Sequence, residues 1–219
     1  MSVGGSVLAP GEPDAAYVKR LAAELRELSR SHRLFVVTGG GRIARAYIEA
    51  GRSLGAPEAI LDGLGIQATR INARLLMAAL GIRDVERLPH SVEDAAKSGG
   101  PIVVMGGTTA GHTTDAVAAE LAQAVTAKRL VNATSVDGVY TADPAKDPAA
   151  KRLDRVSYER LVELAGESHT KAGPSIVFDP KAARVVARAK IPLAVVNGRD
   201  LEALRNAVLG KPFRGTLVG

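Results

Sequence analysis

The sequence predicts an α/β fold in which helices cover both faces of a mainly parallel sheet. Short apolar, β-branched runs alternate with helical segments along the whole chain, which is the pattern of parallel sheets. Some runs, such as Ile102–Met105, are apolar throughout, as strands buried on both faces are. The chain has 219 residues, 46% of them hydrophobic, and neither a linker nor an internal repeat, so residues 1–219 are expected to form one domain.

Composition narrows the classes of function. The absence of cysteine excludes disulfides and thiolate metal sites. The net charge of +6 suits phosphate-bearing ligands, although the lysines and arginines are spread along the chain. Aromatic residues, which stack on bases, make up only 3%, so nucleic-acid binding explains the charge less well. With neither a signal peptide nor an apolar run of membrane-spanning length, we expect a cytoplasmic protein without a membrane partner.

The first half of the chain begins with an unusually short strand. Gly4-Gly5 interrupt the run Ser2–Leu8, so little strand precedes them. Asp14 can cap a helix that continues to Leu28 with its apolar residues on one face. The further elements expected in this half are a buried strand at Leu34–Val37, a helix containing Ile43, Ala44, Tyr47 and Ile48, a helical region that opens at Pro57 and continues through Ile66–Leu80, a short strand at Val85–Leu88 and a brief helix capped by Ser91.

The second half continues the alternation. After the strand Ile102–Met105, Thr113 or Thr114 can cap a helix through Ala116–Val125. Asp137-Gly138, followed by alternating Val, Tyr and Thr, predicts a tight turn and a short hairpin. The further elements expected here are a strand at Arg129–Ala133, a helix at Tyr158–Leu164, a helix from Pro180 through Arg188, a strand at Leu193–Val196 and a helix at Asp200–Val208.

The loop Gly106–His112, between one of these strands and the following helix, has the composition of an anion site. It is rich in backbone N–H groups and has little side-chain bulk. Unpaired amides and the positive end of the helix dipole would converge there, which favours phosphate binding. An ordinary strand–helix turn would need fewer glycines and threonines than this loop has.

Three expected strand ends carry glycine loops, at Gly4-Gly5-Ser6, Gly39-Gly40-Gly41 and Gly106-Gly107. In a parallel sheet such loops gather at the carboxyl edge, where ligands bind. One phosphate needs one such loop. Three loops therefore indicate a chain of phosphates, or two phosphorylated ligands that meet end to end.

Other nucleotide-binding motifs fit less well. The chain contains no G-x-x-x-x-G-K-[ST], so it is not a P-loop enzyme. Gly39–Ala44 matches the dinucleotide pattern G-x-G-x-x-A, but no acidic residue ends a following strand about twenty residues later. Asp62 lies at roughly that distance in a helical region, which makes a dehydrogenase the weaker interpretation.

Acid–base and metal chemistry also lack a pattern in the sequence. The spacing of the histidines does not match a metal-binding pattern; they are His32, His90, His112 and His169. Of these, only His112 lies in the loop Gly106–His112. No Ser–His–Asp set can be argued from the sequence. Phosphoryl transfer to a phosphate needs no general base, because the acceptor oxygen is already anionic, and catalysis reduces to alignment and neutralisation of charge. The pattern thus favours a nucleotide or phosphate kinase over a sugar kinase.

Taken together, the motifs resemble the amino acid kinase superfamily. The segments that carry this resemblance are Val3–Leu8, Thr38–Gly41, Gly106–Thr108, Thr113–Asp115 and Asp137–Pro144. Gly39–Ile48, Gly65–Ala73 and Gly106–Ala118 resemble, more narrowly, the uridylate kinases of the archaeal type. The match covers nearly the whole chain in order. It implies ATP-dependent phosphorylation of UMP to UDP with Mg²⁺, on an open αβα sandwich that assembles as a homohexamer, a trimer of dimers.

The resemblance also implies roles for individual residues. The ATP side would comprise Gly4, Gly5, Ser6, Gly41, Arg45, Thr134, Tyr140 and Asp143. The UMP side would comprise Gly40, Asp62, Gly107, Thr108, Thr109, Ala110, Gly111, His112, Thr113 and Thr114. Catalysis would rest on Ser6, Arg45, Asp115 and Lys181, with no metal held by protein side chains. Asp115 resembles the aspartate that orients catalytic lysines, although it could also serve only to charge a helix N-terminus.

Two positions depart from the superfamily pattern. Many members have a lysine two residues before the first glycine, where this chain has Ser2. Arg45, Lys171 and Lys181 are candidates to neutralise the phosphate instead. The first strand also begins several residues late, which implies a stunted strand of lowered stability or a start assigned too late.

Two alternatives remain open from the sequence. Isopentenyl phosphate kinases resemble the opening glycines, but they carry a histidine-bearing motif after the second strand that Gly39–Arg45 lacks. A nucleotide- or oxyanion-binding protein of the same fold with little catalysis is the other, and Ser2 in place of lysine is its best support.

Overall fold

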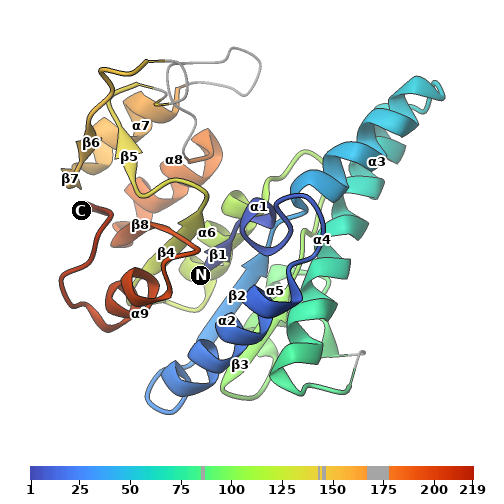
Figure 1. The fold of residues 1–219 in the computed structure, drawn as a ribbon, viewed down its shortest axis with the longest axis horizontal. Coiled ribbons are helices and arrows are strands. Elements are labelled where there is room, and N and C mark those ends of the chain that lie inside the picture. The colour runs from blue at the N-terminus through green and yellow to red at the C-terminus, as the bar shows by residue number, and fades with distance from the viewer. Residues whose placement is uncertain (85–86, 143, 145–146, 167–177) are drawn as a thin grey trace.

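A central sheet organises the computed structural model, which describes residues 1–84, 87–142, 144, 147–166 and 178–219. Its strands are β1 Ser2–Val3, β2 Leu34–Thr38, β3 Ile102–Met105, β4 Leu130–Thr134, β7 Arg155–Val156, β8 Leu193–Asn197 and β9 Thr216–Val218. Their order is β3-β2-β1-β4-β8-β9-β7, and all neighbours run parallel except β8 and β9 (Figure 1). The predicted α/β fold with a mainly parallel sheet is confirmed.

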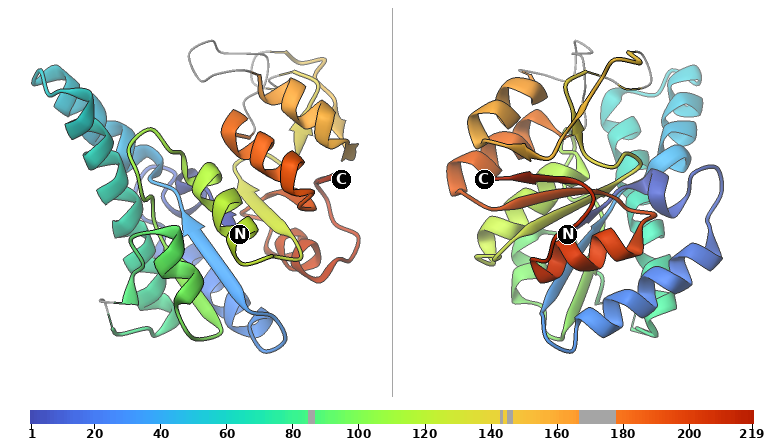
Figure 2. Two further views of the ribbon diagram at one scale, coloured as in Figure 1. Left: turned by 180° about the vertical axis from the view of Figure 1, so that it is seen from behind. Right: turned by 60° about the vertical axis from the view of Figure 1, so that its left-hand side comes forward.

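Helices cover both faces of this sheet (Figure 2). Their bounds are α1 Gly5–Leu8, α2 Ala15–Leu28, α3 Gly41–Ser53, α4 Glu58–Leu80, α5 Val92–Lys97, α6 Thr114–Ala124, α7 Tyr158–Ala165, α8 Pro180–Ala189 and α9 Leu201–Leu209. α1, α2, α4 and α9 share one core with Val36, whereas α5, α6, α7 and α8 share the other with Val37. Successive strand residues point to opposite faces, so adjacent valines serve separate cores.

The helix starts follow the caps that the sequence predicts. The side chains of Asp14, Ser91 and Thr113 accept hydrogen bonds from the backbone of the first turns of α2, α5 and α6.

α3 and α4 pack against each other and extend beyond the sheet in both figures. None of the helices in the described part of the chain combines the length and apolar character needed to span a membrane.

Four details of the expected element list need correction. The run Ser2–Leu8 is a two-residue strand followed by the short helix α1, because the chain turns at Gly4. The hairpin strand β5, Val139–Tyr140, pairs with β6, Arg152–Leu153, so Asp137-Gly138 precede the hairpin and do not form its turn. The edge strand β7 and its neighbour β9 were not expected. The strand proposed at Val85–Leu88 lies partly outside the described residues, and Arg87 and Leu88 are not in a strand.

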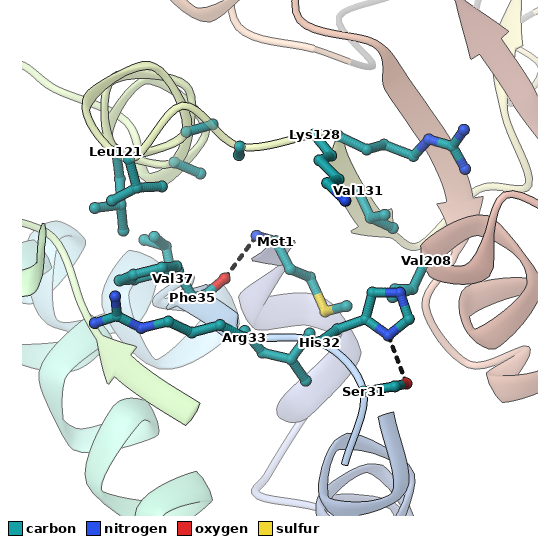
Figure 3. A pocket seen from close by; sticks show the side chains of 16 residues that line it. Met1, Ser31, His32, Arg33, Phe35, Val37, Leu121, Lys128, Val131 and Val208 are labelled. Carbon is teal, nitrogen blue, oxygen red and sulfur yellow. Dashed lines mark hydrogen bonds between the residues drawn. The ribbon is translucent and has the colours of Figure 1, made fainter. Parts of the chain in front are cut away.

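The central strand β1 has only two residues, although both of its neighbours have five. Ser2 pairs with Val37 of β2 and with Asn132 of β4. Before Ser2, β2 and β4 continue on either side of a cavity of about 370 Å³ (Figure 3). The α-amino group of Met1 lies in it and donates a hydrogen bond of 2.7 Å to the carbonyl of Phe35. A cavity therefore lies at the amino end of β1, between its two longer neighbouring strands.

Candidate functional site

The first two glycine loops meet backbone to backbone at the carboxyl edge of the sheet. A Cβ atom placed on Gly5 would lie 2.0 Å from the backbone nitrogen of Gly41 and 2.5 Å from the carbonyl carbon of Gly40. Gly41 adopts φ +64°, a conformation that favours glycine. These loops thus require glycine for close approach as well as for backbone freedom.

The third loop joins them through α4. The backbone N–H of Gly107 donates a hydrogen bond of 2.6 Å to Oγ1 of Thr69. The methyl group of the same threonine lies 3.4 Å from the Cβ position of Gly40. The three glycine corners predicted to share one polyphosphate region therefore lie at one edge of the sheet.

Backbone donors at this edge suit anions. The N-cap residue of α3 is Gly40, which has no side chain to cap the amides of that helix's first turn. Thr113 does cap α6, accepting from the N–H of Ala116 at 3.2 Å. The amino end of α3 is thus the better placed of the two to add its dipole to an anion site.

The position where many superfamily members have lysine is part of a buried polar cluster. Ser2 is fully buried, and its hydroxyl donates a hydrogen bond of 2.7 Å to Oδ1 of Asp115. Asn132, its register partner on β4, is 2% exposed, and within the described ranges its Nδ2 has no hydrogen-bond partner. Serine satisfies one acceptor of the aspartate but supplies no positive charge.

Lys181 lies next to the central loop. Its Nζ is 2.6 Å from Nε2 of His112 and 3.0 Å from Oε1 of Glu120 on α6. A lysine ammonium can only donate, so the imidazole nitrogen accepts. The lysine side chain is 42% exposed, which leaves it room to turn toward a ligand. Two of the residues expected in the site are therefore brought together.

A second recess, of about 350 Å³, lies where the adenosine end of ATP was expected. Tyr140 lines it, and its hydroxyl donates to Oδ1 of Asp137. Burial alone would raise the pKa of Asp137, but the hydrogen bond from Tyr140 and the guanidinium of Arg214 outweigh burial and lower that pKa. The hydrogen bond to the carboxylate in turn raises the pKa of the Tyr140 phenol.

Sequence reasoning missed three side chains that line this recess. Asn197 is the last residue of β8, Asp200 lies shortly after that strand, and Arg214 precedes β9. The first two could have been found, because they lie at the end of a buried parallel strand, where ligand-binding residues gather. Arg214 gave no such signal, since β9 was not expected.

Of the remaining residues expected in the site, some are accessible on the surface and others lie outside the described part of the chain. Arg45 is exposed on α3 and Asp62 is half-buried on α4, and neither side chain has a hydrogen bond or ion pair with any residue that the structure describes. Thr134 ends β4, and its Cα lies 3.8 Å from the Cβ position of Gly4. Asp143 and Lys171 lie outside the described residues.

No group of three histidine, aspartate or glutamate side chains in the described part of the chain could hold a metal ion. Mg²⁺ in phosphoryl-transfer sites usually keeps several waters and binds through substrate phosphates with one or two carboxylates.

Comparison with known proteins finds relatives that match nearly the whole chain. The model of the amino acid kinase family matches residues 1–197. The uridylate kinase of Thermococcus sibiricus is 46% identical over 99% of this chain and 96% of its own length, and that of Methanocorpusculum labreanum is 47% identical over 100% and 94%. The crystal structure of uridylate kinase from Archaeoglobus fulgidus superposes with a TM-score of 0.87 at 40% identity, covering 100% of this chain and 98% of that one. This chain therefore belongs to the amino acid kinase family.

Proposed function

We propose that this chain transfers the γ-phosphoryl group of ATP to UMP, giving UDP and ADP. The observation that carries the proposal is the meeting of three glycine corners at one sheet edge, in a chain whose full-length relatives are uridylate kinases. Backbone amides from several loops can hold the phosphates of two nucleotides that face each other.

The reaction needs little covalent participation by the protein. An anionic oxygen of the UMP phosphate attacks the γ-phosphorus of ATP, and the bond from that phosphorus to the β–γ bridging oxygen breaks. The bridging oxygen keeps the electron pair and leaves on ADP, so no proton must be removed. Catalysis therefore depends on alignment and on neutralising charge.

We assign the two nucleotides to opposite sides of the corner formed by Gly5 and Gly41. Gly4, Gly5 and Ser6 would hold the transferring group through backbone N–H, with Gly41 and Arg45 on the remaining ATP phosphates. The recess lined by Tyr140 would receive adenosine. Thr134, which precedes the lining residue Ser135, and Asp143 are assigned there by resemblance alone. UMP would contact Gly40, Asp62 and the loop from Gly107 to Thr114, which includes Thr108, Thr109, Ala110, Gly111, His112 and Thr113. Bound Mg²⁺ would supply further neutralisation on the ATP phosphates.

Lys181 is our candidate for the cation that Ser2 does not provide. It lies beside the loop that we assign to UMP, with an exposed side chain and an ammonium shared between His112 and Glu120. Turning from these partners to a phosphate exchanges one charge-assisted contact for another. Asp115 would position the site through Ser2, to which it is hydrogen bonded.

We also propose that the chain forms a homo-oligomer, a hexamer built as a trimer of dimers. The paired helices α3 and α4 present the large apolar side chains that are most exposed in the described residues, Tyr47, Leu54, Ile60 and Ile71. Covering them would remove apolar area from water. Because UMP and ATP are cytoplasmic metabolites, we place the protein in the cytoplasm.

The direct test is turnover of the purified chain with ATP, Mg²⁺ and each nucleoside monophosphate in turn. UDP formation with UMP, and much slower product formation with the other monophosphates, is the expected result. Calorimetry with UMP and a non-hydrolysable ATP analogue is the companion measurement. Binding of both without any UDP would instead identify a nucleotide-binding protein that has lost catalysis.

A further inference from the structure

We propose that Thr69 and Asn72 of α4 are positioning residues. They would fix the loop from Gly107 to Thr114, which we assign to UMP, relative to the contact of Gly5 with Gly41, which we place between the two nucleotides. The inference rests on the proposed function, since it concerns the alignment of UMP with ATP. Both side chains are buried, at 7% and 1% exposure, on a helix whose buried face is otherwise mostly apolar. Buried polar groups on such a face are costly unless they are hydrogen bonded, and both bond to glycine loops.

Asn72 is hydrogen bonded to the second glycine loop, Gly39-Gly40-Gly41. Its Nδ2 donates to the carbonyl of Gly39 at 2.7 Å and lies 3.4 Å from that of Gly40. These are the residues that follow β2 and precede α3. The amide thus ties the turn between β2 and α3 to a helix that begins only at residue 58.

Thr69, on the same helix, is hydrogen bonded to the third glycine loop, Gly106-Gly107. Its hydroxyl donates to the carbonyl of Ile66 at 2.6 Å, which directs a lone pair toward the N–H of Gly107, also at 2.6 Å. The neighbouring Arg70 donates from Nε to the carbonyl of Gly107 at 3.3 Å. Gly107 is therefore held at both its donor and its acceptor.

The spacing of the two residues explains why they act together. Positions three apart lie on one face of a helix, about one turn from each other. The backbone of that turn is also fixed to the sheet, since the hydroxyl of Thr38 donates to the carbonyl of Thr69 at 2.9 Å. The distance between the Gly40 and Gly107 corners is thus set by a rigid helix and does not depend on the loops alone.

Asp62 lies on the same helix, so α4 links all three groups that we assign to UMP. Losing one tie would let UMP bind in a broader range of positions. Misplacement by about 1 Å can lower the rate of a transfer reaction on the order of 100-fold. The effect should therefore fall mainly on kcat with UMP, and much less on the KM for ATP.

The test compares Thr69→Val with Thr69→Ser in the full chain. Valine keeps the branched shape and loses the hydroxyl, whereas serine keeps the hydroxyl. We expect kcat to fall about 10- to 100-fold for Thr69→Val and to stay within about threefold of the unchanged chain for Thr69→Ser. Asn72→Leu should behave like Thr69→Val.

Met77→Ala is the control for a loss that is merely structural. Met77 is buried on α4 more than one helical turn after Asn72, in the apolar core that also contains Leu76 and Leu80. This variant should melt at a lower temperature yet keep kcat within about twofold at temperatures where it is folded. Equal kcat for Thr69→Val and the unchanged chain, or loss of activity in Thr69→Val that only parallels its folded fraction, would overturn the positioning role. Absence of UDP with the unchanged chain would instead overturn the proposed function, and this inference with it.

Discussion

At its carboxyl end β1 enters a backbone contact so close that only glycine fits, whereas at its amino end it opens into a cavity (Figure 3). The contact joins Gly5 to Gly40 and Gly41, and the cavity surrounds Met1. Both lie on the same central strand, between the same neighbours β2 and β4. The difference teaches that close packing is concentrated at the edge where we propose that two nucleotides are aligned, while a cavity lies at the opposite end of β1.

Disrupting the contact between Gly5 and Gly41 should have the largest effect on UMP phosphorylation. In Gly5→Ala the new methyl group would lie 2.0 Å from a backbone nitrogen, which cannot turn away as a flexible side chain can. The corners must separate, so we expect UMP phosphorylation to fall on the order of 100-fold or more. Gly11→Ala is the matched control, because nothing lies within 4 Å of its Cβ position. Full activity in Gly5→Ala would show that the close contact is not needed for transfer.

Removing the proposed cation should have the next largest effect. We expect Lys181→Met to lower kcat about 10- to 100-fold, because charge on the transferring group would be less neutralised. Thermal unfolding should barely change, since ion pairs of partly exposed lysines contribute about 0–1 kcal/mol. Lys181→Arg should keep part of the rate. An unchanged kcat in Lys181→Met would reduce Lys181 to a surface partner of Glu120.

The features that could be predicted from the sequence are those that depend on short stretches of neighbouring residues. Apolar runs such as Ile102–Met105 identified strands, capping residues such as Asp14 identified helix starts, and glycines that follow strands identified the edge where the site lies. These signals are local because they depend on backbone propensity and on side-chain period.

The features that could not be predicted depend on contacts between distant segments. Gly107 and Thr69 are 38 residues apart, and β5 pairs with a strand that begins more than ten residues later. The strand β9 has three residues, too few for a side-chain period to be recognised. One signal was present but not used: Thr69 and Asn72 are polar residues on the otherwise apolar face of α4, and such residues need partners.

Filling the hollow end should stabilise the chain without changing catalysis. An extension with isoleucine and valine directly before Met1 would continue β1 between β2 and β4 and place apolar side chains in the cavity. Burial of one such side chain contributes about 1.5–3 kcal/mol, and ordering each residue costs about 1–2 kcal/mol, so a net gain of roughly 2 kcal/mol with the added ladder hydrogen bonds is expected in urea unfolding. A Gly-Ser extension of equal length controls for chain length. A large change in kcat would show that the two ends of β1 are coupled.

The smallest expected effect concerns the charge of Met1 in this cavity. Burial lowers the pKa of its α-amino group from 8.0 to about 5. Between those values the unfolded chain binds a proton that the folded chain does not, so stability rises with pH across this window. Between pH 7 and pH 8 this group should add about 1 kcal/mol to the free energy of unfolding. The Gly-Ser extension replaces the amine by an amide that does not titrate, so the difference in unfolding free energy between the two chains should change over this interval. Parallel pH profiles for the two chains would mean that water in the cavity solvates the ammonium, and that the hollow end of β1 is wet.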